Sequence, residues 1–519
     1  MKIRREILAV SMLMLAISAV SAQDNSTPQS APETQTGAQQ PIPAYGQENA
    51  PTPITENPPL SGMDLPSLEP HSAPLSYLQP GATFSESASS NLGNTPGGSQ
   101  FGSISRGLAN LALKRLWSHY DLALDYVGGV AYYSKGIGFK QLQDMGLEQK
   151  ILWKRGQLSL RDSFSYLPEG NFGGAYGSLG SSAIATMGHS PFGSFWSGSG
   201  LGALGLTPRV LNVSLGELSE NLTPKSALTA AGGYAFTHFY GNNFNGSSFI
   251  GSSQVSGQVG YNRILTSHTQ MALVYGYQGF DFSVLGTAFH SHIVQGMYGH
   301  RISGRMDLLV GAGPQITMIG QACTALDVLL GNPHCSLDPN GLPIGSIPST
   351  KIGVAGQARL RYKFTRTAMD LRFERFETSG DGLFAGAQTN IVRLSAERPL
   401  SRVWGASVDL GYAHNSRLQP LTPQQQTTCG TGSQSSQNAC PAADARTYVY
   451  GFAGLAIHRH FGREFHGFLS YQDNELWFDH SYCALPASGS VPPLPCNRIA
   501  NRQVVTFGLD WTPRPIRID

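Results

Sequence analysis

The sequence predicts an all-β protein: a transmembrane antiparallel β-barrel of about 16 strands preceded by a disordered N-terminal arm. Apolar and polar residues alternate with a period of two over most of the chain beyond residue 120, as in strands with one apolar and one polar face. Charged residues make up only 13% of the chain, about half the roughly 25% of globular proteins. No stretch beyond residue 22 is as long and apolar as a transmembrane helix. A membrane protein built of strands needs few charges, because its outer wall must be apolar.

Residues 1–22 have the order of a secretory signal peptide. A cluster of basic residues precedes an apolar run, Ile7–Val20, and small residues up to Ala22 provide a cleavage site. The apolar run is shorter than the ~20 residues of a membrane-spanning helix. We therefore expect export of the chain and cleavage after Ala22.

Residues 23–105 are predicted to form a disordered arm. From Gln23 to Gln100 the chain has no Lys or Arg and is rich in Pro, Gln, Ser and Thr, with a modest negative charge from acidic residues. Such a segment buries too little apolar surface to offset the entropy of ordering it. The arm is either a plain linker or the binding site of a periplasmic partner. Over residues 106–119 the apolar spacing predicts a short amphipathic helix leading into the barrel.

Strands are predicted from residue 120 to residue 512, and residues 513–519 follow as a tail. The clearest alternation runs from Lys351 to Phe364, and another runs from Gln254 to Asn262. The predicted strands are 120–133, 146–155, 157–167, 209–218, 227–240, 250–263, 269–282, 289–301, 306–318, 351–364, 367–377, 385–396, 402–414, 446–459, 464–477 and 502–512. Their lengths suit strands that cross a bilayer at a tilt.

The connections between these strands alternate in length. Short turns lie near residues 155, 222, 266, 304, 366, 400 and 462, whereas long segments cover 168–207, 320–350, 415–446 and 478–501. Outer-membrane barrels have an even strand number, short periplasmic turns and long outer loops. We therefore expect both termini in the periplasm. A soluble β-sandwich also shows alternation, but with so few charges this many strands would lack solubilising groups.

Six cysteines form three close pairs, each inside one long segment. The pairs are Cys323 with Cys335, Cys429 with Cys440, and Cys483 with Cys496. An even count in an exported chain predicts local disulfides within these loops. The alternatives are free thiols or a metal site, and the absence of a Cys-x-x-Cys motif argues against zinc.

The last predicted strand, Val504–Trp511, has a glycine followed by apolar residues at alternate positions. Its key residues are Phe507, Gly508, Leu509 and Trp511. In this respect the chain resembles the Gram-negative outer-membrane β-barrel superfamily, and the likeness is architectural. The resemblance implies recognition of this strand by the barrel-assembly machinery and a surrounding of outer-membrane lipid and lipopolysaccharide. Residues 513–519 depart from the pattern, because an aromatic residue often ends such chains.

Charged residues on the polar faces of neighbouring strands are candidate pore-lining residues. They are Arg359, Arg361, Lys363, Asp370, Arg372, Glu374, Arg393 and Asp409. Side chains on the inner wall set the electrostatic field of a lumen. They could instead pair across strands and hold the wall together, and the two interpretations are compatible. Because acidic residues oppose the basic ones, we expect at most a weak anion preference.

Other polar residues give weaker signals for chemistry. Histidines share strand faces at His290 and His292 and at His458, His460 and His466, but such residues more often have interfacial or lumenal roles than metal-binding ones. Asp281, His290 and Ser291 lie near one another in a predicted hairpin without a nucleophile motif around them. We therefore predict no enzyme activity, no metal and no cofactor.

Two classes of function follow from this fold. The first is a porin-like or export pore for small solutes or an exported polymer, with the aromatic segment Glu169–Leu206 as the candidate constriction and the N-terminal arm as a candidate plug. The second is a non-conducting surface barrel, an adhesin, receptor or structural protein that binds through disulfide-bonded loops. A net charge of +2 lacks the excess of basic residues that nucleic-acid binding requires. The sequence leaves the oligomeric state open.

Overall fold

The computed structural model describes most of the chain beyond residue 76. The described residues are 60, 76–92, 99–168, 208–240, 250–282, 287–323, 325–339, 341, 343–364, 366–380, 382–418, 446–482 and 497–518. The predicted signal peptide, almost all of the arm up to residue 75, the segment Glu169–Leu206 and the cysteines at 429, 440, 483 and 496 lie outside them. Among the described residues, no helix has the length and apolarity needed to cross a membrane.

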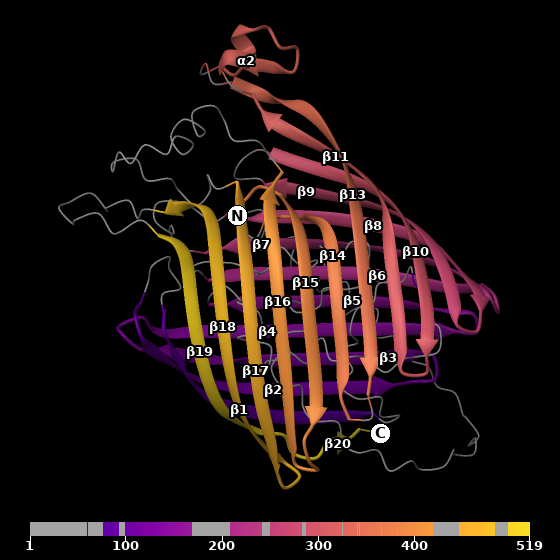
Figure 1. The fold of residues 1–519 in the computed structure, drawn as a ribbon, viewed down its shortest axis with the longest axis vertical. Coiled ribbons are helices and arrows are strands. Elements are labelled where there is room, and N and C mark those ends of the chain that lie inside the picture. Colours follow the sequence, from indigo (N-terminus) through magenta and orange to yellow (C-terminus); the bar gives the residue numbers. More distant parts are fainter. Residues whose placement is uncertain are drawn as a thin grey trace. The chain divides into compact units, whose positions relative to one another are not determined.

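The described chain is a succession of long strands (Figure 1). The strands are β1 (Tyr77–Ser89), β2 (Gly102–Leu116), β3 (Tyr120–Tyr133), β4 (Gly138–Trp153), β5 (Gly156–Leu167), β6 (Arg209–Thr223), β7 (Ser226–Phe239), β8 (Ser252–Thr266), β9 (Thr269–Phe282), β10 (Thr287–Ser303), β11 (Met306–Ala322), β12 (Cys335–Leu337), β13 (Pro343–Lys363), β14 (Ala368–Thr378), β15 (Ala387–Pro399), β16 (Trp404–Arg417), β17 (Thr447–Phe461), β18 (Phe465–Tyr482), β19 (Asn497–Trp511) and β20 (Ile516–Arg517). One short helix, α2 (Ala325–Leu329), precedes β12.

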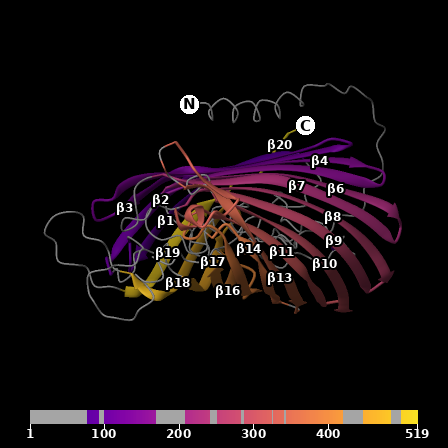
Figure 2. The same ribbon diagram turned by 90° about the horizontal axis from the view of Figure 1, so that it is seen from above.

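The strands form one closed antiparallel barrel of 18 strands. Each long strand pairs with the next along the chain, and β1 pairs with β19 from Ala82↔Trp511 to Ser89↔Val504, which closes the ring. The short strands β12 and β20 add to β13 and β1 without widening the ring. Figure 2 shows the wall of β2, β4, β6 and β7 facing the wall of β14, β16, β17 and β18 across the interior.

The predicted count of about 16 strands is corrected to 18. Every predicted strand is present, and the two additional strands are β1 and β2. Residues 77–89 were expected in the disordered arm, and residues 106–119 were expected as a helix; both expectations are wrong. The outward face of β1 includes Pro80 and Glu86, and that of β2 includes Ser103, Ser105 and Arg115, so neither strand has the continuous apolar stripe that marks a strand in sequence. Closure of the ring supplies both edges of β1 with partners, so its own composition does not have to stabilise it.

Side chains alternate between an apolar outer face and a polar inner face. On β8, Val255, Val259 and Tyr261 are 51%, 50% and 44% exposed. Gln254 and Gln258, which directly precede Val255 and Val259, are buried. A soluble barrel has the opposite arrangement. Exposed apolar residues outside and buried polar residues inside are the architecture of an outer-membrane β-barrel.

An aromatic girdle lines part of the end of the barrel that carries the short turns, at the ends of β2–β4 and β13–β19. Its exposed members are Trp117, Tyr120, Trp153, Phe364, Trp404, Phe461, Phe465 and Trp511. The Arg459 guanidinium lies 5.1 Å from the ring centroid of Trp404 and 5.0 Å from that of Phe461. Aromatic rings and cationic heads gather at the lipid–water interface of membrane proteins. The girdle therefore marks one interface, and we call this end of the barrel the turn end.

A charge placed on the outer wall tests this assignment. Arginine at Val259, in the middle of β8, should reduce the free energy of unfolding by about 2–4 kcal/mol, because its guanidinium would face the bilayer midplane. The matched control is Leu265→Arg on the same face of β8, two residues from the turn, where the cost falls to about 0–1 kcal/mol. Urea unfolding of the protein in lipid vesicles measures both. An equal loss of unfolding free energy at the two positions would contradict the assignment of the outer wall of β8 to the bilayer.

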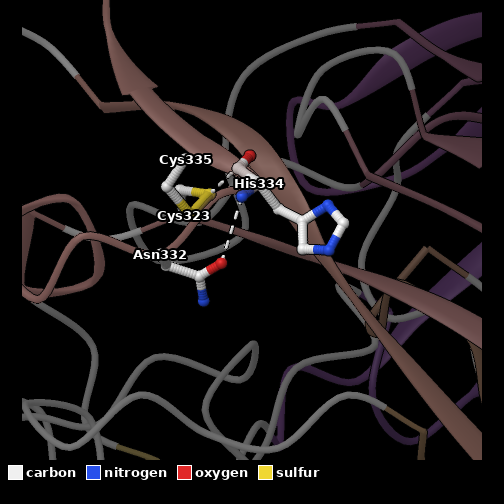
Figure 3. Close-up of a disulfide and its surroundings, with 4 residues drawn as sticks. All are labelled: Cys323, Asn332, His334 and Cys335. Carbon is white, nitrogen blue, oxygen red and sulfur yellow. Dashed lines mark hydrogen bonds between the residues drawn. A yellow bond between two sulfur atoms is a disulfide. The ribbon is translucent and has the colours of Figure 1, made fainter.

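The connections at the opposite end, which we call the loop end, are longer. The β11–β13 connection contains α2 and β12 and rises beyond the other strands (Figure 1). A disulfide joins Cys323 to Cys335 at its base, with the two Cα atoms 5.7 Å apart (Figure 3). Asn332 caps the turn, because its Oδ1 accepts from the backbone N–H of His334 at 3.1 Å. The first of the three predicted disulfides is confirmed.

Reduction of this disulfide should loosen the loop and leave the barrel folded. A ring of this size is worth about 2–3 kcal/mol in the chain-entropy model, and that amount acts locally, because the neighbouring ladder of β11 with β13 holds the wall. Limited proteolysis of Cys323→Ser should therefore cleave between residues 323 and 343 faster than in the unchanged chain. Heat-modifiable gel migration, which reports the folded barrel, should not change. Loss of the folded band would mean that the disulfide supports the wall itself.

Candidate functional site: the charged inner wall

A buried ion-pair cluster lies on the inner wall between β13 and β14. Asp370 is 1% exposed. Its Oδ2 accepts from Arg359 Nε at 2.6 Å, and its Oδ1 accepts from Arg372 Nε at 2.9 Å. The cluster forms because Arg359 is paired in register with Arg372, and Asp370 lies next to both. One carboxylate thus holds two guanidinium groups of neighbouring strands.

Two further ion pairs extend the cluster around the wall. Arg361 on β13 contacts both carboxylate oxygens of Asp307 on β11, with Nε 3.0 Å from one oxygen and 2.8 Å from the other. Arg393 on β15 donates to Asp409 on β16, from Nε to one carboxylate oxygen at 2.9 Å and from Nη2 to the other at 2.5 Å. Paired guanidinium–carboxylate contacts of this geometry fix both side chains. A row of alternating charges therefore runs across five strands of the inner wall.

The structure places the eight candidate pore-lining residues on one face. Seven lie together on β13–β16, and Lys363 lies exposed at the turn end of β13. Glu374 is buried beside the cluster, and within the described chain its Oε2 has no hydrogen-bond partner. The residues that form ion pairs across strands are thus the same residues that lie on the inner wall. Passage of solutes along them stays a prediction.

Sequence reasoning missed a second charged cluster on the opposite wall. Arg161 on β5 is surrounded by the carboxylates of Asp125, Asp144 and Glu148 from β3 and β4. Ser165 donates to Asp144 at 2.7 Å. The strand predicted over 146–155 begins at Gly138 in the structure, so Asp144 fell outside the expected wall. Before residue 146 the outward Gln141 and Gln143 and the inward Leu142 interrupt the alternation, so no sequence pattern marks Asp144 as an inner-wall residue.

The connection between β14 and β15 folds inward at the loop end. Residues 379–386 are described except Asp381. Phe384 is fully buried, with its ring centroid 5.2 Å from that of Tyr448 on β17. On the other side the backbone N–H of Ile250, at the start of β8, donates to the carbonyl of Gly382 at 2.9 Å. This connection therefore touches walls on both sides of the interior, and we call it the inner loop.

Apolar residues of several strands pack around the inner loop. One cluster joins Ala385 and Leu418 to aromatic residues of β9 and β10, and another joins Leu383 and Phe384 to β15–β19. Phe289 lies so close to Gly386 that a Cβ there would be 2.5 Å from its ring. The sequence singled out Glu169–Leu206 as the constriction, and that segment lies outside the described residues. The apolar pair Leu383-Phe384 inside a glycine-rich turn was the missed signal.

The hypothetical catalytic residues do not meet. Ser291 points inward, where its hydroxyl donates to Glu377, and Thr317 donates to the other oxygen of that carboxylate at 2.5 Å. His290 points outward beside Tyr277, and Asp281 is exposed on the outer face. Consecutive residues of a strand lie on opposite faces. The structure therefore separates the serine from both of its hypothetical partners.

The histidine rings lie edge to face, with interplanar angles of 86–90°. His290 and His292 lie 6.3 Å apart by ring centroid, and His460 lies 5.9 Å from His458 and 4.5 Å from His466. His292 Nδ1 shares a hydrogen bond of 2.9 Å with the hydroxyl of Tyr275. In the described ranges, no group of three or more His, Cys, Asp or Glu side chains has the geometry to hold a metal ion.

Comparison with known proteins gives structural likeness alone. No protein-family model matches the sequence, and no curated protein matches it. Among solved structures, the chain is similar to Pseudomonas aeruginosa OccK2 (OpdF), with 9% identity and a TM-score of 0.38 over 84% of this chain and 98% of that chain. P. aeruginosa OpdL gives 10% and 0.39 over the same shares. OpdK of the same organism, solved with vanillate, gives 8% and 0.37, again over 84% and 98%. At this level of similarity we draw no functional conclusion from them.

Proposed function

We propose that this outer-membrane barrel is a porin-like pore for small solutes or an exported polymer. The observation that supports the proposal is the ring of 18 strands with a polar and charged inner wall. A closed barrel of 16–18 strands is wide enough for an aqueous channel, whereas about eight strands are filled by their own side chains. Inner faces of Gln, Ser, Asn and ion pairs are hydratable, as a water-filled path requires.

The proposed orientation places the turn end in the periplasm. Both barrel termini, Tyr77 and Trp511, lie at the turn end, because an even number of strands returns the chain to the side from which it started. Short turns face the periplasm in bacterial barrels. The strand ending in Trp511 presents Phe507 and Leu509 outward, and we propose that the barrel-assembly machinery binds it and that outer-membrane lipid and lipopolysaccharide surround the belt.

The inner wall favours small polar or charged solutes of either sign. On β13–β15 an ion pair with a carboxylate is made by each of four arginines, Arg359, Arg361, Arg372 and Arg393. The wall of β3–β5 carries three carboxylates around Arg161. Such a lumen combines positive and negative surfaces and should show at most weak charge selectivity. Planar-bilayer recording of the refolded protein tests the proposal. Stepwise conductance supports it, and silence of both the full chain and a variant lacking residues 23–75 contradicts it.

One observation favours a second candidate function, binding at the outer surface. The disulfide-bonded connection between β11 and β13 exposes four leucines, at positions 326, 329, 330 and 337, and Leu329 is 82% exposed. An exposed apolar patch on a covalently closed loop is typical of an interaction surface. In this alternative the barrel is an adhesin, receptor or structural protein. Loss of cell or matrix binding on removal of 324–334, with no conductance in any variant, would favour it.

A further inference from the structure

The wall of the barrel divides between β13 and β14 at the loop end. The ladder of these two strands ends at the pair Gly356↔Arg375. Beyond this pair, β13 continues in register with β11 as far as Ser346, and β14 continues with β15 as far as Thr378↔Ala387. Figure 1 shows β13 rising past the end of β14. We call the place where the two strands separate the fork.

Arg375 lies on the outer wall at the point where β14 leaves the ring. It follows the exposed Phe373 by two positions, and Glu374 between them is buried on the inner face. In a straight strand Glu377 would also point outward. Instead, its carboxylate accepts hydrogen bonds from a serine of β10 and a threonine of β11 on the inner wall. The end of β14 therefore passes inside the ring, and Arg375 lies at the base of the fork.

The guanidinium of Arg375 bonds neutral acceptors on both sides of the fork. Its Nε donates to the backbone carbonyl of Val354 on β13 at 3.0 Å, and its Nη1 and Nη2 donate to Asn390 Oδ1 at 3.4 Å and Gln388 Oε1 at 3.3 Å on β15. No carboxylate of the described ranges forms an ion pair with this arginine. After these bonds, each terminal nitrogen retains one further N–H donor. The group thus has a positive charge and two donors to offer to an anion.

Apolar side chains cover the outer wall on the turn side of Arg375. Phe373, Val392 and Tyr412 are neighbours in register on β14, β15 and β16, and all three are exposed. Across the fork, Ile352 on β13 is 77% exposed. Exposed apolar side chains on the outer wall of such a barrel meet the acyl chains of the bilayer. We call Phe373, Val392 and Tyr412 the apolar row.

A polar row lies next to the apolar row, toward the loop end. It consists of Arg375, Asn390 and His414, which are paired in register on the outer face of β14, β15 and β16. With the turn end in the periplasm, as proposed above, the polar row is nearer the outer surface. An amphiphile of the outer leaflet has the same order, with its polar head outside and its acyl chain inside. Because Arg375 makes the polar row cationic, the complementary head is anionic.

We propose that the fork binds an amphiphile with a carboxylate head and an acyl chain, the carboxylate on Arg375 and the chain along the apolar row. A carboxylate has two oxygens for the two remaining N–H donors and supplies the counter-charge that the neutral acceptors lack. An arginine on the lipid face is costly in free energy, and a bound anion offsets that cost. Binding does not require that the barrel conducts, so this site and the proposed pore are tested separately.

Other occupants fit the fork less well. A neutral lipid leaves the guanidinium without a counter-ion in the hydrocarbon belt. A strand from another protein chain would have to pair with the free edge of β13. On that edge the carbonyl of Val354 already accepts from Arg375. The carboxylate amphiphile satisfies both the charge and the apolar row.

Binding is tested by native mass spectrometry of the delipidated, refolded full-length protein, with oleate as the probe. The unchanged chain should retain one oleate. Methyl oleate has the same chain without the charge, and it should bind at least about tenfold more weakly, because charge-assisted hydrogen bonds are lost. Equal retention of the two compounds overturns the proposal. This comparison uses the unchanged chain, so it does not depend on the folding of any variant.

The position of the site is tested with Arg375→Gln, which keeps an amide donor and removes the charge. Oleate should bind this variant at least about tenfold more weakly than the unchanged chain. The matched control is Arg263→Gln, because Arg263 is an exposed, outward arginine on β8, far from the fork, and its loss should leave oleate binding unchanged. Heat-modifiable migration verifies that both variants are folded. Equal oleate binding by folded Arg375→Gln and the unchanged chain overturns the assignment, as does retention of lipid A or of a second copy of the chain in place of oleate.

Discussion

Replacing Asp370 by Asn should destabilise the barrel more than any other single charge change on the inner wall. The carboxylate is 1% exposed and bonds both Arg359 and Arg372. Asparagine keeps the shape and removes the charge, so two guanidinium groups lose their common counter-ion in a site with little water. Breaking a buried ion pair in this way costs about 3–5 kcal/mol. Urea unfolding in lipid vesicles, followed by tryptophan fluorescence, measures the change.

The matched control for this prediction is Asp281→Asn. It removes the same charge from an exposed position on the outer face of β9 and should change the free energy of unfolding by less than about 0.5 kcal/mol. In bilayers the Asp370→Asn pore should also shift toward anions, because its wall gains net positive charge. Similar stability of the two variants would mean that water screens the Asp370 cluster. An unchanged reversal potential would place the conducting path away from β13 and β14.

The strands of the wall were predictable from sequence wherever the lipid-facing side chains form a regular apolar series. The strand over residues 120–133 and the strand over 269–282 were predicted with the bounds that the structure shows, because large apolar residues recur at alternate, outward positions. β2 shows why others were missed. Leucines point inward at Leu108 and outward at Leu111 and Leu113, so both faces are partly apolar, and the period of two is lost.

The positions of the site residues followed from sequence, but their partners did not. Alternation alone assigns Arg359 and Arg361 to one face of a strand. Their counter-ions depend on the register between strands, and that register places Asp307 opposite Arg361 although 54 positions separate them. No periodicity within a strand contains this information. The inner loop was missed for the same reason, because its contacts with Ile250 and Tyr448 join segments that only closure of the ring brings together.

The inner loop should control the width of the loop end. Phe384 is fully buried and packs on Tyr448, and the carbonyl of Gly382 accepts from Ile250 across the interior. Phe384→Ser removes the ring that fills this space, and loss of a buried phenylalanine costs about 3–5 kcal/mol. The ladders on both sides of the loop remain, so the barrel should stay folded and heat-modifiable. Its single-channel conductance should rise severalfold, because water enters where the ring was.

The control variant is Leu330→Ser, which removes an apolar side chain that is 76% exposed on the β11–β13 connection. It should change neither the conductance nor the free energy of unfolding. A conductance of Phe384→Ser equal to that of the unchanged chain would mean that the inner loop does not limit the conducting path.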